Sequence, residues 1–146
     1  MDFSEISIKR IIPQRSPFLM VDRVVRCDES DAYLEFLVTQ DNVLAEDNAL
    51  SASGIIENMA QSCAALMGCG CILRGVPITI GYIGEVRNAK INKLPQCGQT
   101  IHTHVHVIEE VFNIILADVK IIEGYDVIAT AQIKVAKTDI VANLKD

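Results

Sequence analysis

The sequence lacks the features that mark membrane-spanning, secreted and zinc-binding proteins. No apolar run approaches the roughly 18 residues that a membrane span needs, and the N-terminal stretch MDFSEISIKR has no apolar segment of the secretory type. None of the cysteines forms a C-x-x-C pair, the spacing typical of zinc and redox sites. We therefore expect a cytoplasmic chain with reduced thiols and no membrane partner. The cysteines are Cys27, Cys63, Cys69, Cys71 and Cys97.

An excess of basic charge is also absent. Asp and Glu number 19 against 13 Lys and Arg, which gives a net charge of −6 and a pI near 5.0. Nucleic-acid binding is therefore not expected. The charge is uneven, because residues 28–57 contain no Lys or Arg while basic residues precede and follow them. The two basic segments either form one patch for an acidic partner or are ordinary solvated charge.

The hydrophobic pattern predicts a single α+β domain over residues 1–146. Half of the residues are hydrophobic, and no repeat or linker interrupts them. A short helix capped by Ser4 is predicted near the N-terminus and a polar loop over 40–50. One long helix packed on an antiparallel sheet of about five or six strands is the expected architecture. Strands are predicted at 18–28, 32–40, 78–91, 98–110, 112–122 and 125–137.

The predicted central helix, near residues 53–72, is apolar almost all round. Such a pattern is typical of a helix buried in the middle of a domain. Ser51 or Ser53 is the expected N-cap. A single polar stripe contains Glu57 and Gln61, which are one turn apart on the same face. We expect Glu57 to have a functional role in such surroundings, since carboxylates are rarely buried without a partner.

Three stretches resemble the hot-dog-fold 3-hydroxyacyl-[acyl carrier protein] dehydratases of fatty acid synthesis. They are IIPQRSPFLMVDRVV, GIIENMAQSCAAL and GYIGEVRNAKINKLPQCGQTI, and they occur in the family's order along nearly the whole chain. The subgroup found in aryl-polyene and flexirubin-type pigment clusters is the most similar. The resemblance implies a hot-dog fold, sites at the interface of a homodimer or heterodimer, and loss of water from an acyl thioester on acyl carrier protein. It implies no metal and no cofactor.

The family's catalytic pair is a histidine in a Gly-His-Phe-Pro loop and the acid of the central helix. Glu57 matches the acid, because Met59, Ala60 and Gln61 follow in register. The histidine has no counterpart, since the loop DNVLAEDNALSAS contains none. Asp47 and Glu46 are therefore candidates for a replacement base. Residues expected to bind the substrate are Ser53, Gly54, Asn48 and Gln61, with backbone N–H groups at the helix start facing the thioester carbonyl.

Three further expectations follow. His102, His104 and His106 alternate with Thr103, Val105 and Val107, so a strand places the imidazoles on the face opposite the core. Docking of the carrier protein is assigned to Arg15, Arg23, Arg87, Lys90 and Lys93. For function, a dehydratase with an altered catalytic pair is weighed against a hot-dog thioesterase and against a non-catalytic subunit that pairs with an active dehydratase.

Overall fold

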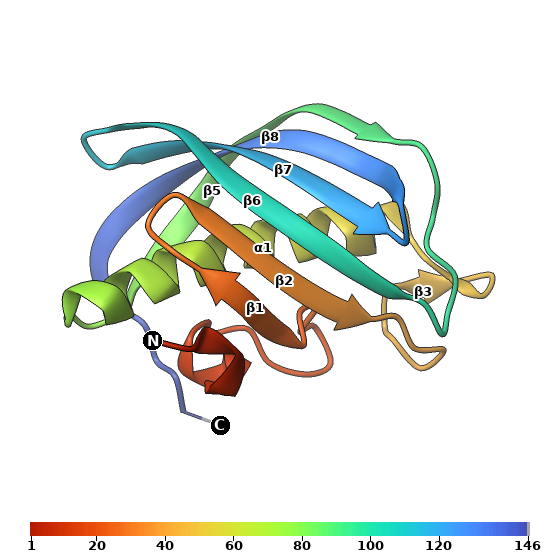
Figure 1. Ribbon diagram of the computed structural model, residues 1–146, viewed down its shortest axis with the longest axis horizontal. Coiled ribbons are helices and arrows are strands. Elements are labelled where there is room, and N and C mark those ends of the chain that lie inside the picture. Colours follow the sequence, from red (N-terminus) through yellow and green to blue (C-terminus); the bar gives the residue numbers. More distant parts are fainter. Residues whose placement is uncertain (146) are drawn as a thin grey trace.

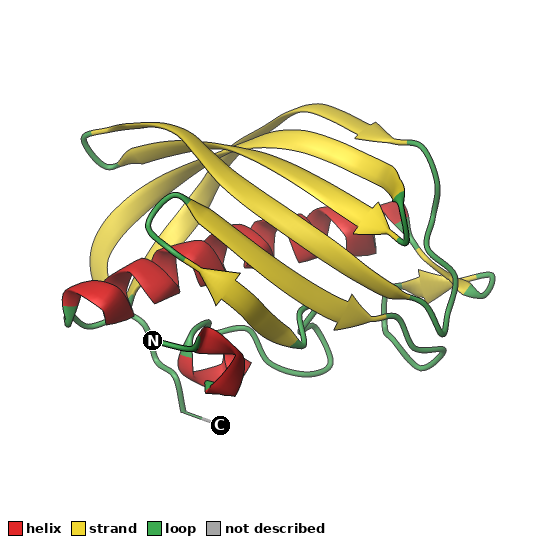
Figure 2. Ribbon diagram, in the orientation of Figure 1, coloured by secondary structure: helices red, strands yellow, loops and turns green. Residues whose placement is uncertain are grey.

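A single antiparallel sheet curves around one long helix in the computed structural model, which describes residues 1–145 (Figure 1). The six strands lie in the order β1-β2-β6-β7-β8-β5, and α1 lies along the concave side of the sheet (Figure 2). The predicted α+β hot-dog architecture is thereby confirmed. The elements are β1 Arg23–Cys27, β2 Asp31–Leu37, β3 Ala45–Glu46, β4 Ala49–Leu50, α1 Ala52–Arg74, β5 Thr79–Ile91, β6 Thr100–Val111, β7 Ile114–Glu123 and β8 Asp126–Val141.

The boundaries of α1 follow from its capping residues. The side chain of Ser51 accepts a hydrogen bond from the N–H of Gly54, and Gly75 ends the helix in the left-handed conformation with φ 69°. Gly68 permits a close crossing, because an added Cβ would lie 2.4 Å from the carbonyl oxygen of Ile11. By length and composition α1 could cross a membrane, but 67% of its most apolar window is buried inside this domain.

The strands alternate between the core and the outer face as their sequences predict. On β6, Thr103 and Val105 are buried, whereas His102 and His106 are exposed and His104 is half-buried. The predicted placement of the histidines on the face opposite α1 is therefore confirmed. Their cross-strand neighbours on β2 are Glu35, Tyr33 and Asp31.

The local predictions for the N-terminus and for residues 40–50 differ from the structure. Residues 3–12 form two short 3₁₀ helices, Phe3–Glu5 and Ile8–Arg10, and their capping side chains are Asp2 and Ser7, not Ser4. The predicted polar loop over 40–50 contains the hairpin of β3 and β4. Asp47 and Asn48 form its two-residue turn with φ of 51° and 62°, which Asp and Asn tolerate better than most residues.

Candidate functional site around Glu57

Glu57 lies on one narrow, half-exposed stripe of α1. Between Gly54 and Cys71 every helix residue is buried except five, which are Ile56, Glu57, Ala60, Ala64 and Met67. At about 100° per residue these five positions fall within one arc of roughly 100°. The sheet and the N-terminal segment therefore cover this part of α1 on all sides but one, and Glu57 is the only charged residue among these five.

Gln61 fixes the orientation of the Glu57 carboxylate. The Nε2 amide of Gln61 donates to Glu57 Oε1 at 3.1 Å and to the carbonyl oxygen of Phe18 at 2.8 Å. Its Oε1 accepts from the backbone N–H of Met20 at 2.7 Å. Because Gln61 is fully buried and bonded at both ends, its amide cannot rotate freely. It holds Glu57 in place, while direct binding of substrate by Gln61 stays a prediction.

Asn58 and Gln61 together form what we call the clasp, a set of hydrogen bonds from two side chains of α1 to the segment before β1. The Nδ2 of Asn58 donates to the carbonyl oxygen of Met20 at 2.7 Å, and its Oδ1 accepts from the hydroxyl of Thr103 at 2.6 Å. Both backbone polar groups of Met20 are thus bonded to helix side chains. This explains why β1 begins at Arg23 and not near residue 18 as predicted. Thr103 could have been identified from the sequence, since it is a hydroxyl on an otherwise apolar strand face.

The start of α1 is less available to a ligand than expected. The N–H of Gly54 already donates to Ser51 Oγ at 3.2 Å, so this group is used by the cap. Gly54 is also tightly enclosed, because an added Cβ would lie 2.3 Å from Leu50 Cδ1. Ser53 is exposed at the same end of the helix. Substrate binding at Ser53 and Gly54 stays a prediction, and the capping bond reduces the number of free donors there.

The candidates for a base lie elsewhere. Glu46, Asp47 and Asn48 form the exposed tip of the β3–β4 hairpin, where they line a separate surface hollow of about 300 Å³. Within residues 1–145, no hydrogen bond or ion pair joins any of them to Glu57; Asn48 instead accepts from Gln40 at 3.4 Å. The chain's histidines lie on the outer face of the sheet. A catalytic role for Asp47 or Glu46 stays a prediction, without support from contacts.

The outer histidines form their own cluster. His104 Nε2 and His106 Nδ1 both contact Asp31 Oδ1, at 2.7 and 2.9 Å, and the His104 ring stacks on Tyr33 with centroids 4.3 Å apart. Burial alone would raise the pKa of Asp31, but hydrogen bonds from His104, Ser30 and His106 lower it to about 2. No group of three metal-binding side chains with suitable geometry occurs in the described part of the chain.

The model of the ApeP-like family, described as ApeP dehydratase, matches residues 6–145. The chain belongs to the ApeP-like dehydratase family. No curated protein matches it.

Solved structures share the fold of this ApeP-like chain at low sequence identity. The dehydratase heterocomplex ApeI:P from Xenorhabdus doucetiae has a TM-score of 0.84 and 16% identity over 92% of both chains. The PaaI protein of E. coli has a TM-score of 0.63 and 14% identity over 77% of this chain and 80% of that one. A hypothetical thioesterase with coenzyme A from Streptococcus pneumoniae has a TM-score of 0.63 and 10% identity, over 82% and 87%. At these identities the likeness shows the fold alone.

The open stripe of the ApeP-like chain borders an unpaired strand edge. Among the described residues β5 pairs only with β8, so its other edge presents backbone groups without a strand partner there. Tyr82 and Ile83 on this strand are 56% and 42% exposed. Gly81 lies directly against the stripe, because an added Cβ would be 2.6 Å from Met67 Cε. A strand edge, two exposed apolar side chains and the stripe carrying Glu57 thus adjoin one another.

The residues assigned to carrier docking do not form one patch. Arg23 lies on β1 and Arg87 and Lys90 on β5, the two opposite edge strands. Arg23 forms a close ion pair with Glu35, and Lys93 Nζ lies 3.2 Å from Glu123. The guanidinium of Arg15 donates to the backbone carbonyls of Lys9, Ile12, Gln14 and Leu144, so it ties the two chain ends together. Docking by these residues stays a prediction, best placed at Arg87 and Lys90.

Proposed function

We propose that this chain supplies the acid of a dehydratase site formed between two hot-dog subunits, and that the partner subunit supplies the base. The substrate is a 3-hydroxyacyl thioester on an acyl carrier protein. One observation supports this most directly: Glu57 lies on the uncovered stripe of α1, and within residues 1–145 its only side-chain hydrogen bond is the one from Gln61. A partner packed on this stripe would bury Glu57 and bring a base to it.

The chemistry requires two groups with opposite tasks. The partner's base removes the proton next to the thioester carbonyl, and a protonated Glu57 gives its proton to the departing hydroxyl, which leaves as water. The double bond forms between the two carbons. Because Glu57 Oε1 accepts from Gln61, the proton that Glu57 donates is carried by Oε2. Gln61 thereby directs the acidic oxygen away from the core and toward the open side of α1.

The neighbouring edge of β5 supports assembly. An unpaired edge with exposed apolar side chains is a common site of strand pairing between subunits. The structure most similar in fold among those described above is a dehydratase heterocomplex. A heterodimer therefore suits this chain better than a homodimer, because two identical copies would bring two acids and no base.

Reconstitution tests the proposal. This chain, a hot-dog dehydratase subunit that carries the loop histidine, and their mixture are each supplied with a 3-hydroxyacyl-[acyl carrier protein]. We expect no turnover by this chain alone and faster formation of the 2-enoyl product by the mixture than by the partner alone. Full turnover by this chain alone would overturn the proposal of a partner base. Release of free thiol without an enoyl product would identify a thioesterase instead.

A further inference from the structure

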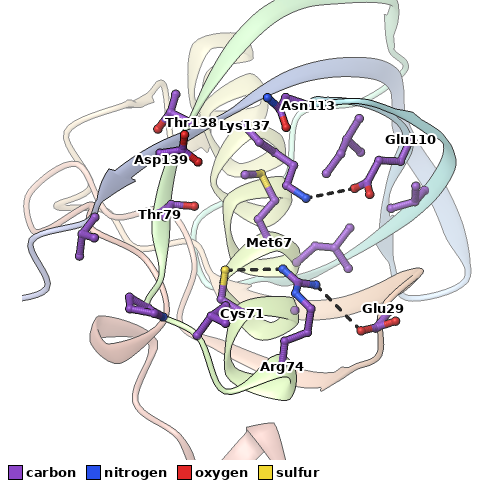
Figure 3. Close-up of a pocket in the computed structure, with 17 residues that line it drawn as sticks. Glu29, Met67, Cys71, Arg74, Thr79, Glu110, Asn113, Lys137, Thr138 and Asp139 are labelled. Atoms are coloured by element: carbon purple, nitrogen blue, oxygen red, sulfur yellow. Dashed lines mark hydrogen bonds and ion pairs between the residues drawn. The ribbon is translucent and has the colours of Figure 1, made fainter.

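A cavity lies at the opposite end of α1 from Glu57. It has a volume of about 480 Å³ and is enclosed by the C-terminal turns of α1, the start of β5, the β6–β7 hairpin and the end of β8 (Figure 3). Met67, which lines it, is ten residues beyond Glu57, or roughly 15 Å along the helix axis. The cavity is therefore separate from the Glu57 carboxylate, although Met67 belongs both to the cavity lining and to the open stripe of α1.

Arg74 places a guanidinium in this cavity. Within the described residues its N–H groups donate no short hydrogen bond to an oxygen. The side chain folds back over Gly70, where an added Cβ would lie 3.1 Å from Nη1. Its contacts in the described chain are weak: Nη2 lies 3.8 Å from Cys71 Sγ, and Nη1 lies 3.9 Å from Glu29. Neither contact is a full hydrogen bond to an oxygen. Gly70 thus leaves space for the Arg74 guanidinium, whose hydrogen-bond donors are only weakly used within the described residues.

Lys137 on β8 places a second cation in the same cavity. Its Nζ lies 3.3 Å from Glu110 Oε1, a pair that Figure 3 marks with a dashed line, and both Lys137 and Arg74 line the cavity. The side chains of Glu110 and Glu29 are 47% and 68% exposed. Ion pairs with such exposed carboxylates contribute little stability. A bound anion can therefore displace them, and the acids, with the exposed Asp139, then remain in solvent at the rim.

One part of the lining is apolar, beside the polar side chains of Thr79, Asn113 and Thr138. The apolar part consists of Leu66 and Met67 of α1, Val107 and Ile115 of the sheet, and Val141 of β8. Leu66 and Ile115 are 5% and 6% exposed, so this surface belongs to the edge of the core. A cavity with an apolar wall and a few polar groups that fix orientation is typical of small-molecule sites.

We propose that this cavity binds an amphiphilic carboxylate, with the carboxylate between Arg74 and Lys137 and the apolar tail on Leu66, Met67 and Ile115. The planar fork of a guanidinium matches the two oxygens of a carboxylate, which favours this group over a point anion. The apolar wall requires a tail, so small anions such as acetate fill only part of the site.

Calorimetric titration of the full chain with octanoate tests this proposal. Octanol supplies the same tail without charge, and acetate supplies the charge without the tail. We expect octanoate to bind at least about tenfold more tightly than either, because it alone makes both kinds of contact. Equal binding of octanoate and octanol, or no binding of octanoate at millimolar concentration, would overturn the proposal.

Matched variants locate the site. Arg74→Met and Lys137→Met should each weaken octanoate binding about tenfold or more, since each removes a charge-assisted hydrogen bond. Lys134→Met is the control, because Lys134 also lies on β8 and pairs with an exposed acid, Glu85 at 3.5 Å, outside this cavity. Gly70→Ala should weaken binding without unfolding, by displacing the guanidinium. Equal losses in the control, or amide NMR shifts confined to Ile56–Ala60, would contradict the assignment.

Discussion

Gln61 and Glu57 are joined by a hydrogen bond in which the Gln61 amide Nε2 donates to Glu57 Oε1 at 3.1 Å. The same amide is held by the backbone of Phe18 and Met20, so the carboxylate takes its orientation from a segment about 40 residues earlier in the sequence. The clasp of Gln61 and Asn58 therefore serves two purposes. It replaces strand pairing for residues 18–20 and it sets which oxygen of Glu57 faces the open side of α1.

Removal of the Gln61 side chain should destabilise the fold. Gln61→Ala leaves the buried N–H of Met20 and the part-buried carbonyl of Phe18 without their partners, which we expect to cost about 2–3 kcal/mol. Urea unfolding measures this free energy. Gln132→Ala, which removes an amide from the outer face of the sheet, should change it by less than about 0.5 kcal/mol. Equal effects of the two substitutions would contradict the structural role of the clasp.

Much of this architecture can be predicted from the sequence. The all-round apolar pattern of residues 54–73 identifies the buried helix, and alternation in TIHTHVHVI places the histidines outside. The clasp cannot be predicted in the same way, because Asn58 and Gln61 act on the backbone of Met20, which carries no sequence signal. The β3–β4 hairpin is missed because its strands have two residues each, too short for a periodic pattern. The sequence also cannot show that the basic residues occupy opposite sheet edges.

The unpaired edge of β5 predicts association. Light scattering of the folded protein, alone or mixed with its partner subunit, should give a mass well above the 16.0 kDa of one chain. Ile83→Lys should shift the mass toward 16.0 kDa with little loss of thermal stability, since the side chain is 42% exposed and a charge on an edge opposes pairing. Tyr125→Lys, at a fully exposed turn residue, is the control. An unchanged mass for Ile83→Lys would exclude this edge as the interface.

The Asp31 cluster should stabilise the folded protein at neutral pH, and this stabilisation should be lost in strong acid. Hydrogen bonds from His104, Ser30 and His106 outweigh burial and hold the folded-state pKa of Asp31 near 2, below its ordinary 3.8. Its contribution is therefore fully present above pH 3.8 and is lost as the pH falls toward 2. Asp31→Asn should cost about 1–2 kcal/mol at pH 7, a figure reduced for solvent screening. Chemical unfolding of Asp31→Asn and the control Asp118→Asn at pH 7 and 2.5 measures this, and a penalty as large at pH 2.5 as at pH 7 would contradict it.

Carrier docking at β5 predicts a salt dependence. Charge reversal in Arg87→Glu and Lys90→Glu should weaken binding of an acidic acyl carrier protein about tenfold at low salt. The difference should vanish near 1 M salt, where the screening length is about 3 Å. Lys120→Glu, on β7, is the control. Affinities measured by biolayer interferometry that do not respond to either reversal would remove these residues from the docking surface.

The most direct measurement of the proposed acid is the turnover of the reconstituted complex with Glu57→Gln. Glutamine is nearly isosteric, and its carbonyl oxygen can still accept from Gln61, so assembly and the melting temperature should be preserved. Turnover of 3-hydroxyacyl-[acyl carrier protein] should fall by about 10²- to 10⁴-fold at the sites that this chain completes, as expected for loss of a general acid. If the Glu57→Gln complex assembles and turns over as fast as the wild type, Glu57 is not the acid, and the chain acts as a non-catalytic partner.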